Sequence, residues 1–222
     1  MAELNIQNVF LIVFISNLIA IAFLIAPWMQ YRTHFKGLGL FITGMFILAV
    51  SNFSLGLRDV IPDFISIVFS IFLKMTGMVI INTSINLILL KKINKNYYLL
   101  YLMPVIIVIT QVLFSYFVIN LSARITIVSV IIAALSIINC IPVVRSKYFL
   151  TPPGMILFAG FITLAIFFTI RSFFSTITLD TNSFLESGDF QLLNIVIWGI
   201  ATITWPLGVH ALIFKELKEI KG

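Results

Sequence analysis

The sequence predicts an all-α polytopic membrane protein, a bundle of seven transmembrane helices in one domain that covers residues 1–222. Of the 222 residues, 61% are hydrophobic and only 10% are charged, and the mean hydropathy is +1.15. A soluble domain carries about 25% charged residues, so these few charges could not cover a soluble globule. Disordered chains are polar, and the single cysteine, Cys140, cannot make a disulfide scaffold within the chain. A membrane bundle is the class that remains.

Seven apolar stretches are each long enough to cross a bilayer, which takes roughly 20 residues in a helix. In chain order, proline or charged residues break them at Pro27 and Arg32 to Lys36, Arg58 to Pro62, Lys91 to Lys95, Asn120 to Arg124, Arg145 to Pro153, and Asp180 to Asp189. The first stretch lacks a basic leader and a cleavage site, so we expect it to be retained. The predicted helices are about 7–29, 37–57, 62–90, 97–118, 121–143, 153–175 and 190–214.

Lysine and arginine gather on one side of the predicted bundle. Ten fall in alternate connections and in the tail: Arg32, Lys36, Lys91, Lys92, Lys95, Arg145, Lys147, Lys215, Lys218 and Lys221. The turns of the other side hold only Arg58 and Arg124, with six of the eight acids: Glu3, Asp59, Asp63, Asp180, Glu186 and Asp189. The positive-inside rule then places the N-terminus outside and the C-terminus in the cytoplasm. The net charge of +6 is therefore a topology signal, and we expect no nucleic-acid partner.

Small residues recur at helical spacing in the second and third predicted helices. Lipid gives helices no hydrophobic reason to associate, so close packing and buried hydrogen bonds must hold them together. We expect helix packing at Gly44, Ser51, Asn52, Gly77 and Gly160. The similar segments GMFILA (44–49) and GFITLA (160–165) also fit a duplicated three-helix unit around a central fourth helix.

Lys74 stands near the middle of a predicted span, where a lysine costs at least ~2.5–3.5 kcal/mol on insertion scales. No acidic residue lies at a comparable depth to pair with it. Three explanations stay open: the amine snorkels to an interface, it is uncharged, or it faces a wet cavity that accepts an anion. In the last case we expect an outer ligand pocket formed by Lys74, Arg171, Arg58, Ser70, Trp198 and Asn194.

The sequence carries no recognisable catalytic or metal chemistry. Two distant histidines and one cysteine do not make a metal site, no glycine-rich phosphate loop is present, and no carboxylate pair lies at membrane depth. We therefore expect no enzyme activity, no metal and no cofactor.

The segment GLRDVIPDFISIVFS (56–70) follows a glycine-dotted helix and precedes a long helix that ends in basic residues. The chain resembles the multi-helix membrane sensor region of bacterial diguanylate cyclases of the GGDEF class and of related histidine kinases. The likeness lies in Leu57–Arg58, in Pro62–Asp63–Phe64 and in the charged amphipathic run from Phe214 to Lys221. The resemblance implies signalling to an output domain, which this chain does not contain. It would then be either a truncated sensor or a stand-alone relative with a separate partner.

Three functions follow as hypotheses. In the first, a sensor or receptor detects a small ligand, a lipid or a membrane state in its outer half and signals through its cytoplasmic C-terminal helix, with output residues Lys215, Lys218 and Lys221. The alternatives are a small-solute or ion transporter or channel, and a membrane anchor or assembly subunit. Expected partners are membrane lipids, an anionic small ligand, a cytoplasmic signalling partner and a second copy in a homodimer. The expected location is a prokaryotic plasma membrane.

Overall fold

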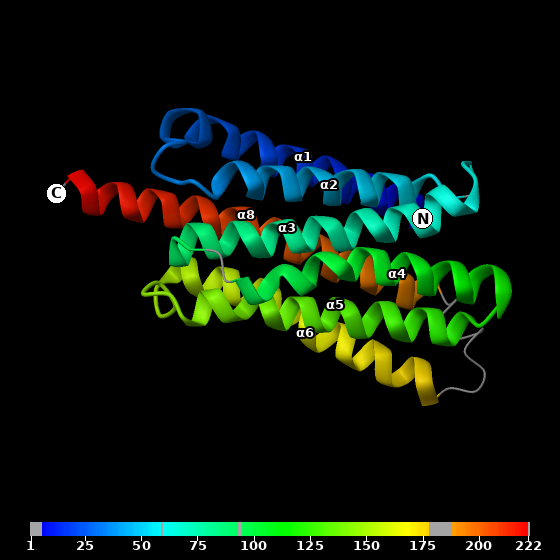
Figure 1. Ribbon diagram of the computed structural model, residues 1–222. Coiled ribbons are helices and arrows are strands. Elements are labelled where there is room, and N and C mark those ends of the chain that lie inside the picture. The colour runs from blue at the N-terminus through cyan, green and yellow to red at the C-terminus, as the bar shows by residue number, and fades with distance from the viewer. Residues whose placement is uncertain (1–5, 59, 93–94, 178–187, 222) are drawn as a thin grey trace.

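The computed structural model describes residues 6–58, 60–92, 95–177 and 188–221, and in these ranges it is helical without strands. Glu3, Asp59, Asp180 and Glu186, and the side chains of Asp189 and Lys221, lie outside what it describes. Its helices are α1 (Ile6–Tyr31), α2 (Leu38–Gly56), α3 (Ser70–Leu90), α4 (Met103–Val112), α5 (Leu121–Val144), α6 (Pro152–Ile177) and α8 (Gly188–Lys221) (Figure 1).

Short irregular helices extend two of these elements. A π-helical turn, Phe64–Phe69, leads into α3, and the segments Lys95–Leu102 and Leu113–Phe117 flank α4. Within the described residues, seven helical segments are long and apolar enough to cross a membrane: 7–31, 38–56, 64–90, 99–117, 121–144, 152–176 and 192–219. The predicted all-helical class is confirmed, and so is the predicted number of helices long and apolar enough to span a membrane, within the described residues.

Local chemistry explains several helix ends. The Asn120 side chain accepts a hydrogen bond from the Ala123 amide at 2.9 Å and caps the start of α5. Lys91, with φ 55°, ends α3 in the left-handed conformation that is frequent after helix C-termini. α1 continues through Pro27 and ends at Tyr31, two residues beyond the predicted end, because membrane helices tolerate a proline where neighbours satisfy the freed backbone groups.

Six helices form a closed ring. α1 packs on α2, α2 on α3, α3 on α5, α5 on α6, α6 on α8, and α8 again on α1. α4 lies outside the ring against α3 and α5, and the Tyr101 and Thr83 hydroxyls, 2.6 Å apart, join its leading segment to α3. The fourth helix is therefore peripheral and not central. The ring consists of two three-helix halves, α1–α2–α3 and α5–α6–α8, in the same order and with corresponding contacts.

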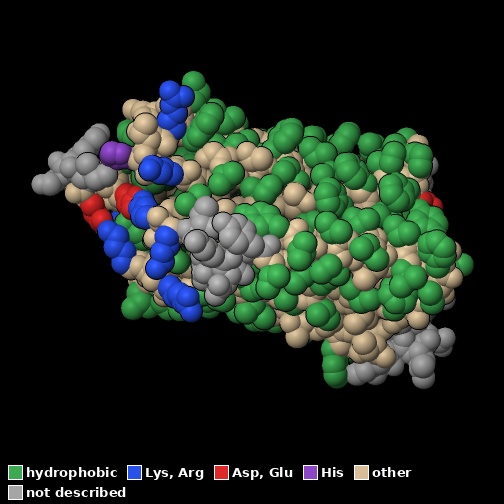
Figure 2. All heavy atoms as spheres, viewed as in Figure 1, with side chains coloured by type: hydrophobic (Ala, Val, Ile, Leu, Met, Phe, Trp, Pro, Cys, Tyr) green, Lys and Arg blue, Asp and Glu red, His purple; other side chains and the backbone are tan. Residues whose placement is uncertain are grey.

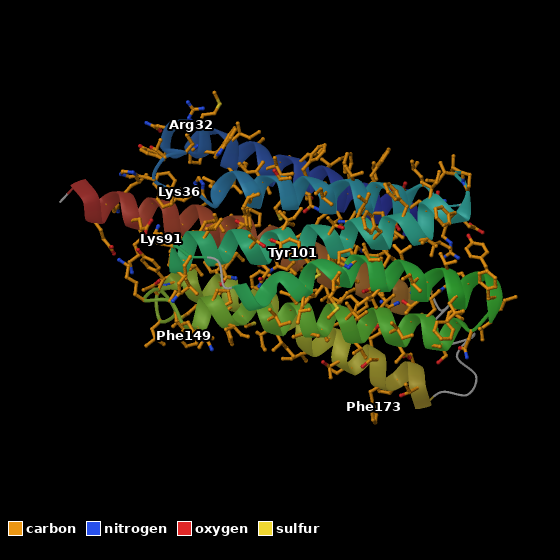
Figure 3. All side chains as sticks on the ribbon, in the orientation of Figure 1. Arg32, Lys36, Lys91, Tyr101, Phe149 and Phe173 are labelled. Atoms are coloured by element: carbon orange, nitrogen blue, oxygen red, sulfur yellow. The ribbon has the colours of Figure 1, made fainter. Side chains whose placement is uncertain are left out.

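The two ends of the bundle differ in charge. Figure 2 shows lysine and arginine side chains gathered at the end that holds the C-terminus, with a broad hydrophobic surface over the middle. Arg32, Lys36 and Lys91 mark this end in Figure 3. We call it the basic end and the opposite one the N-terminal end. The charge pattern from which the sequence predicts an orientation is thus present in three dimensions.

Two glycines bring α2 and α3 into close contact. A Cβ added at Gly44 would lie 3.0 Å from the Gly77 carbonyl oxygen and 2.8 Å from the Ile81 side chain, and one at Gly77 would lie 2.8 Å from Leu48. Small residues permit this approach in membrane helices.

Gly44→Val is therefore expected to lower the melting temperature in detergent by several degrees, because overpacking a core costs about 1–3 kcal/mol. Gly199→Ala is the control, since its new Cβ would meet only the Val13 side chain, at 3.0 Å. Equal effects of the two substitutions would argue against the Gly44–Gly77 contact.

Candidate functional site

Lys74 spans the interior of the ring. It projects from α3, and its ammonium lies 4.5 Å from the centre of the Trp198 ring on α8, which stands opposite α3 in the ring. A cation over tryptophan gains about 0.5–2 kcal/mol. This gain is smaller than the cost of a lysine at membrane depth, so Trp198 alone does not explain why a lysine stands here.

Arg171 and Lys74 converge because their helices run in opposite directions. Side chains lean toward the N-terminus of their own helix. α3 begins at the N-terminal end of the bundle, so Lys74 leans toward that end, whereas α6 begins at the basic end, so Arg171 leans into the membrane. The Arg171 guanidinium carbon lies 5.7 Å from the ring centre of Phe168, one turn deeper, and the Phe168 ring in turn meets the Trp198 ring that Lys74 contacts.

Aromatic rings of α6 and α8 form the wall beside the two cations. Trp198 meets Phe168 and Trp205 edge-on, with ring centres 6.1 and 6.3 Å apart, and Phe161 stacks on Trp205 at 4.7 Å. Trp198 and Trp205 are buried. They are therefore not the interfacial anchors that tryptophans usually make in membrane proteins.

Buried polar atoms around the cations lack partners. Arg171 Nε, Asn194 Oδ1, Trp198 Nε1 and Trp205 Nε1 make no hydrogen bond within the described residues. The ion pairs seen there, Lys91–Glu216 and Lys147–Glu219, include neither Lys74 nor Arg171. Roughly nine in ten buried polar groups in proteins have a hydrogen-bond partner. The unpaired donors and acceptors beside two positive charges are therefore unusual, and they mark this region as the candidate site.

Further unpaired polar atoms lie on the other helices of the ring. The buried side chains of Asn17 on α1, Asn52 on α2 and Ser129 on α5 have polar atoms without a partner among the described residues. Sequence reasoning missed Asn17 and Ser129 as possible site residues and assigned Asn52 to packing alone. The available signal was an asparagine inside an otherwise apolar span.

The structure does not bring all predicted ligand residues together. Lys74 contacts the Trp198 ring, and Arg171 contacts the Phe168 ring, which in turn meets Trp198. Asn194 lies one turn before Trp198 on α8. Ser70 instead belongs to the α2–α3 interface: its hydroxyl donates to the Ser66 carbonyl at 2.6 Å, and its carbonyl accepts from the Ser51 hydroxyl at 2.7 Å. Arg58 is exposed at the end of α2, where its charge acts on Arg124.

The residues predicted for packing lie at helix contacts. Gly44 and Gly77 meet each other, Ser51 bonds to α3, and a Cβ at Gly160 would lie 2.8 Å from the Trp205 ring. Asn52 is fully buried, but packing leaves its amide group unpaired.

At the basic end, an acidic side chain holds the end of α8 against two connections. Glu216 accepts a hydrogen bond from the Tyr148 hydroxyl at 2.9 Å and pairs with Lys91 at 3.3 Å, while Glu219 pairs with Lys147 at 3.5 Å. Burial raises the pKa of Tyr148, which keeps its phenol protonated as the donor. His34 and Phe35 complete the wall of a cavity of about 220 Å³ there. We call the contacts of Glu216 and Glu219 with Lys91, Lys147 and Tyr148 the clamp. The clamp lies on the part of α8 that continues beyond the predicted end at residue 214.

The predicted output lysines surround this clamp. Lys215 lies with its ammonium 5.8 Å from the Tyr148 ring centre, and Lys218 is exposed. The end of α8 is therefore fastened to the bundle through its acids, while lysines remain on its surface.

A separate apolar groove of about 450 Å³ lies between α1 and α8. It is lined by Ser16, Ile19, Ala20, Phe23, Leu24, Ile203, Pro206, Leu207 and His210. Neither this groove nor the cavity at the basic end includes Lys74 or Arg171.

Comparison of the chain with protein-family models, with curated proteins and with solved structures found no match.

Proposed function

We propose that this protein is an integral membrane sensor that binds a small anionic ligand inside the helix ring, between Lys74 and Arg171. One observation carries the proposal: Lys74 and Arg171, on antiparallel helices, lie against the adjoining rings of Trp198 and Phe168, and neither has an ion-pair partner among the described residues. An anion would accept charge-assisted hydrogen bonds from both, each worth about 1.5–3 kcal/mol. Its binding would offset the cost of keeping the two charges in the membrane.

α8 is the element that would carry the signal. The same continuous helix holds Asn194 and Trp198 at the site and Glu216 at the basic end. From Trp198 to Glu216 it rises about 27 Å at 1.5 Å per residue, and shifts of about 1–2 Å in a packed helix are common in switching proteins. With the basic end in the cytoplasm, as the positive-inside rule indicates, the ligand would enter from outside. A cytoplasmic partner would then read α8, as the resemblance to diguanylate cyclase sensor regions implies.

The test measures anion binding to the purified protein in lipid nanodiscs, with sodium propionate and sodium lactate as probes and tryptophan fluorescence as the readout. Lys74→Met and Arg171→Gln are each expected to weaken binding at least tenfold. Arg58→Gln is the matched control, because it removes a cation at the same end but outside the site, and should change binding less than twofold. Binding that is insensitive to Lys74 and Arg171 would refute the proposed site.

The two corresponding halves of the ring favour a second candidate, a small-solute transporter, since internal repeats are a transporter feature. Flux across protein-containing liposomes separates the two functions. The sensor proposal predicts anion binding with a flux no greater than that of empty vesicles. A propionate or lactate flux that Lys74→Met abolishes would establish transport instead.

A further inference from the structure

Asn17 and Asn52 each carry an unsatisfied amide that the cation site does not explain. Both residues are fully buried, and none of their four amide nitrogen and oxygen atoms has a hydrogen-bond partner among the described residues. The contrast is Asn82 and Asn139, which are equally enclosed but bonded to each other, Nδ2 to Oδ1, at 2.8 Å. An unpaired buried polar group is costly, and a helix packed only for stability would carry an apolar residue at such a position.

Both amides lie at about the height of Lys74 in the bundle. The hydrogen bond from Ser51 to the Ser70 carbonyl aligns α2 with α3, which run in opposite directions. Asn52 lies one residue from this bond toward the N-terminal end, and the Lys74 backbone lies one turn from it toward the basic end, but the Lys74 side chain leans back toward the N-terminal end. The Phe14 and Phe53 rings, 4.9 Å apart, align α1 with α2, and Asn17 is one turn beyond Phe14. From these alignments we infer that the two amides and the Lys74 ammonium lie within about one helical turn, 5.4 Å, of each other along the bundle axis.

We propose that Asn17 and Asn52 bind a hydroxyl group of the ligand whose anionic group sits between Lys74 and Arg171. This proposal rests on the proposed function. A carboxamide offers two N–H donors and one carbonyl acceptor, and a hydroxyl both donates and accepts, so the two are complementary. The amides are fully enclosed, which favours a group as compact as a hydroxyl. The ligand class is therefore a small hydroxycarboxylate, and not a simple anion or a fatty acid.

The first arm of the test needs no ligand. Asn17→Leu and Asn52→Leu replace unpaired amides by apolar side chains of similar size, so the melting temperature in detergent is expected to stay unchanged or rise. Asn82→Leu is the matched control and should lower it, because Asn139 then loses its partner. If Asn17→Leu and Asn52→Leu lower the melting temperature as much as Asn82→Leu does, the two amides are structural and the proposal is wrong.

The second arm compares acids that differ only by a hydroxyl, lactate against propionate and malate against succinate, in nanodiscs. The wild type is expected to bind the hydroxylated acid at least tenfold more tightly, because a site built to bond a hydroxyl rejects the analogue that lacks it. Asn17→Leu and Asn52→Leu should bring this ratio close to one and leave propionate binding unchanged.

The outcomes separate the two proposals. Equal binding of both acids by the wild type, still dependent on Lys74, would overturn the hydroxyl site and leave the anion site standing. Binding that does not depend on Lys74, or that is absent for all four acids, would overturn the proposed function and the hydroxyl site with it.

Discussion

Lys74→Met is expected to make the ligand-free protein more stable while it removes anion binding. A lysine at membrane depth costs about 2.5–3.5 kcal/mol on insertion scales, and its contact with the Trp198 ring returns about 1 kcal/mol. Methionine keeps the length of the side chain without the charge. The net gain of about 2 kcal/mol corresponds to a rise of roughly 4–8 °C in melting temperature for a chain of this size, measured by thermal unfolding in detergent.

Lys74→Arg is the control for this effect, because it keeps a positive charge in the ring and should give no such rise. A Lys74→Met variant that melts below the wild type would show that the lysine is a structural element held by Trp198. Gained stability together with lost binding is the pattern of a functional residue, since sites are often kept at the expense of stability.

Glu216→Gln is expected to release the C-terminal end of α8. The Glu216 side chain is only 16% exposed and joins Lys91 and Tyr148, so both contacts lose their charge when the carboxylate becomes an amide. Spin labels are attached at two exposed positions, Lys218→Cys on α8 and Leu150→Cys in the α5–α6 turn. Pulsed electron paramagnetic resonance then measures the distance between the two labels. We expect their distance distribution to broaden and its mean to grow by about 5 Å, one helical turn.

Glu219→Gln is the matched control. It removes the same charge from the same helix, but the Glu219–Lys147 pair is exposed, at 48% and 70%, and exposed pairs contribute little. The buried Cys140 is replaced by alanine in all labelled proteins. If Glu216→Gln moves the α8 end no more than Glu219→Gln does, the end of this helix is held by its apolar packing and not by Glu216.

Lys74 shows how far the site could be predicted. Its cost in a membrane singles it out from the sequence, and the same reasoning selects Arg171. Their convergence on Trp198 and Phe168 could not be predicted, because it depends on the opposite directions of α3 and α6 and on their places in the ring. Ser70 lies one turn from Lys74 on the same helix, yet it bonds within the α2–α3 interface, and Arg58 is exposed just beyond the end of α2.

The sequence alone determined the membrane class, the seven helices and the separation of charge between the two ends. These features follow from hydrophobic length, helix breakers and charge position, which are local properties of the chain. The tertiary structure decided the rest: α4 outside the ring, Asn17 and Asn52 buried without partners among the described residues, and Glu216 in contact with Lys91 and Tyr148. Lipid and protein interior are equally apolar, so hydrophobicity does not show which face of a membrane helix turns inward. Only packing between helices assigns those faces, and with them the site.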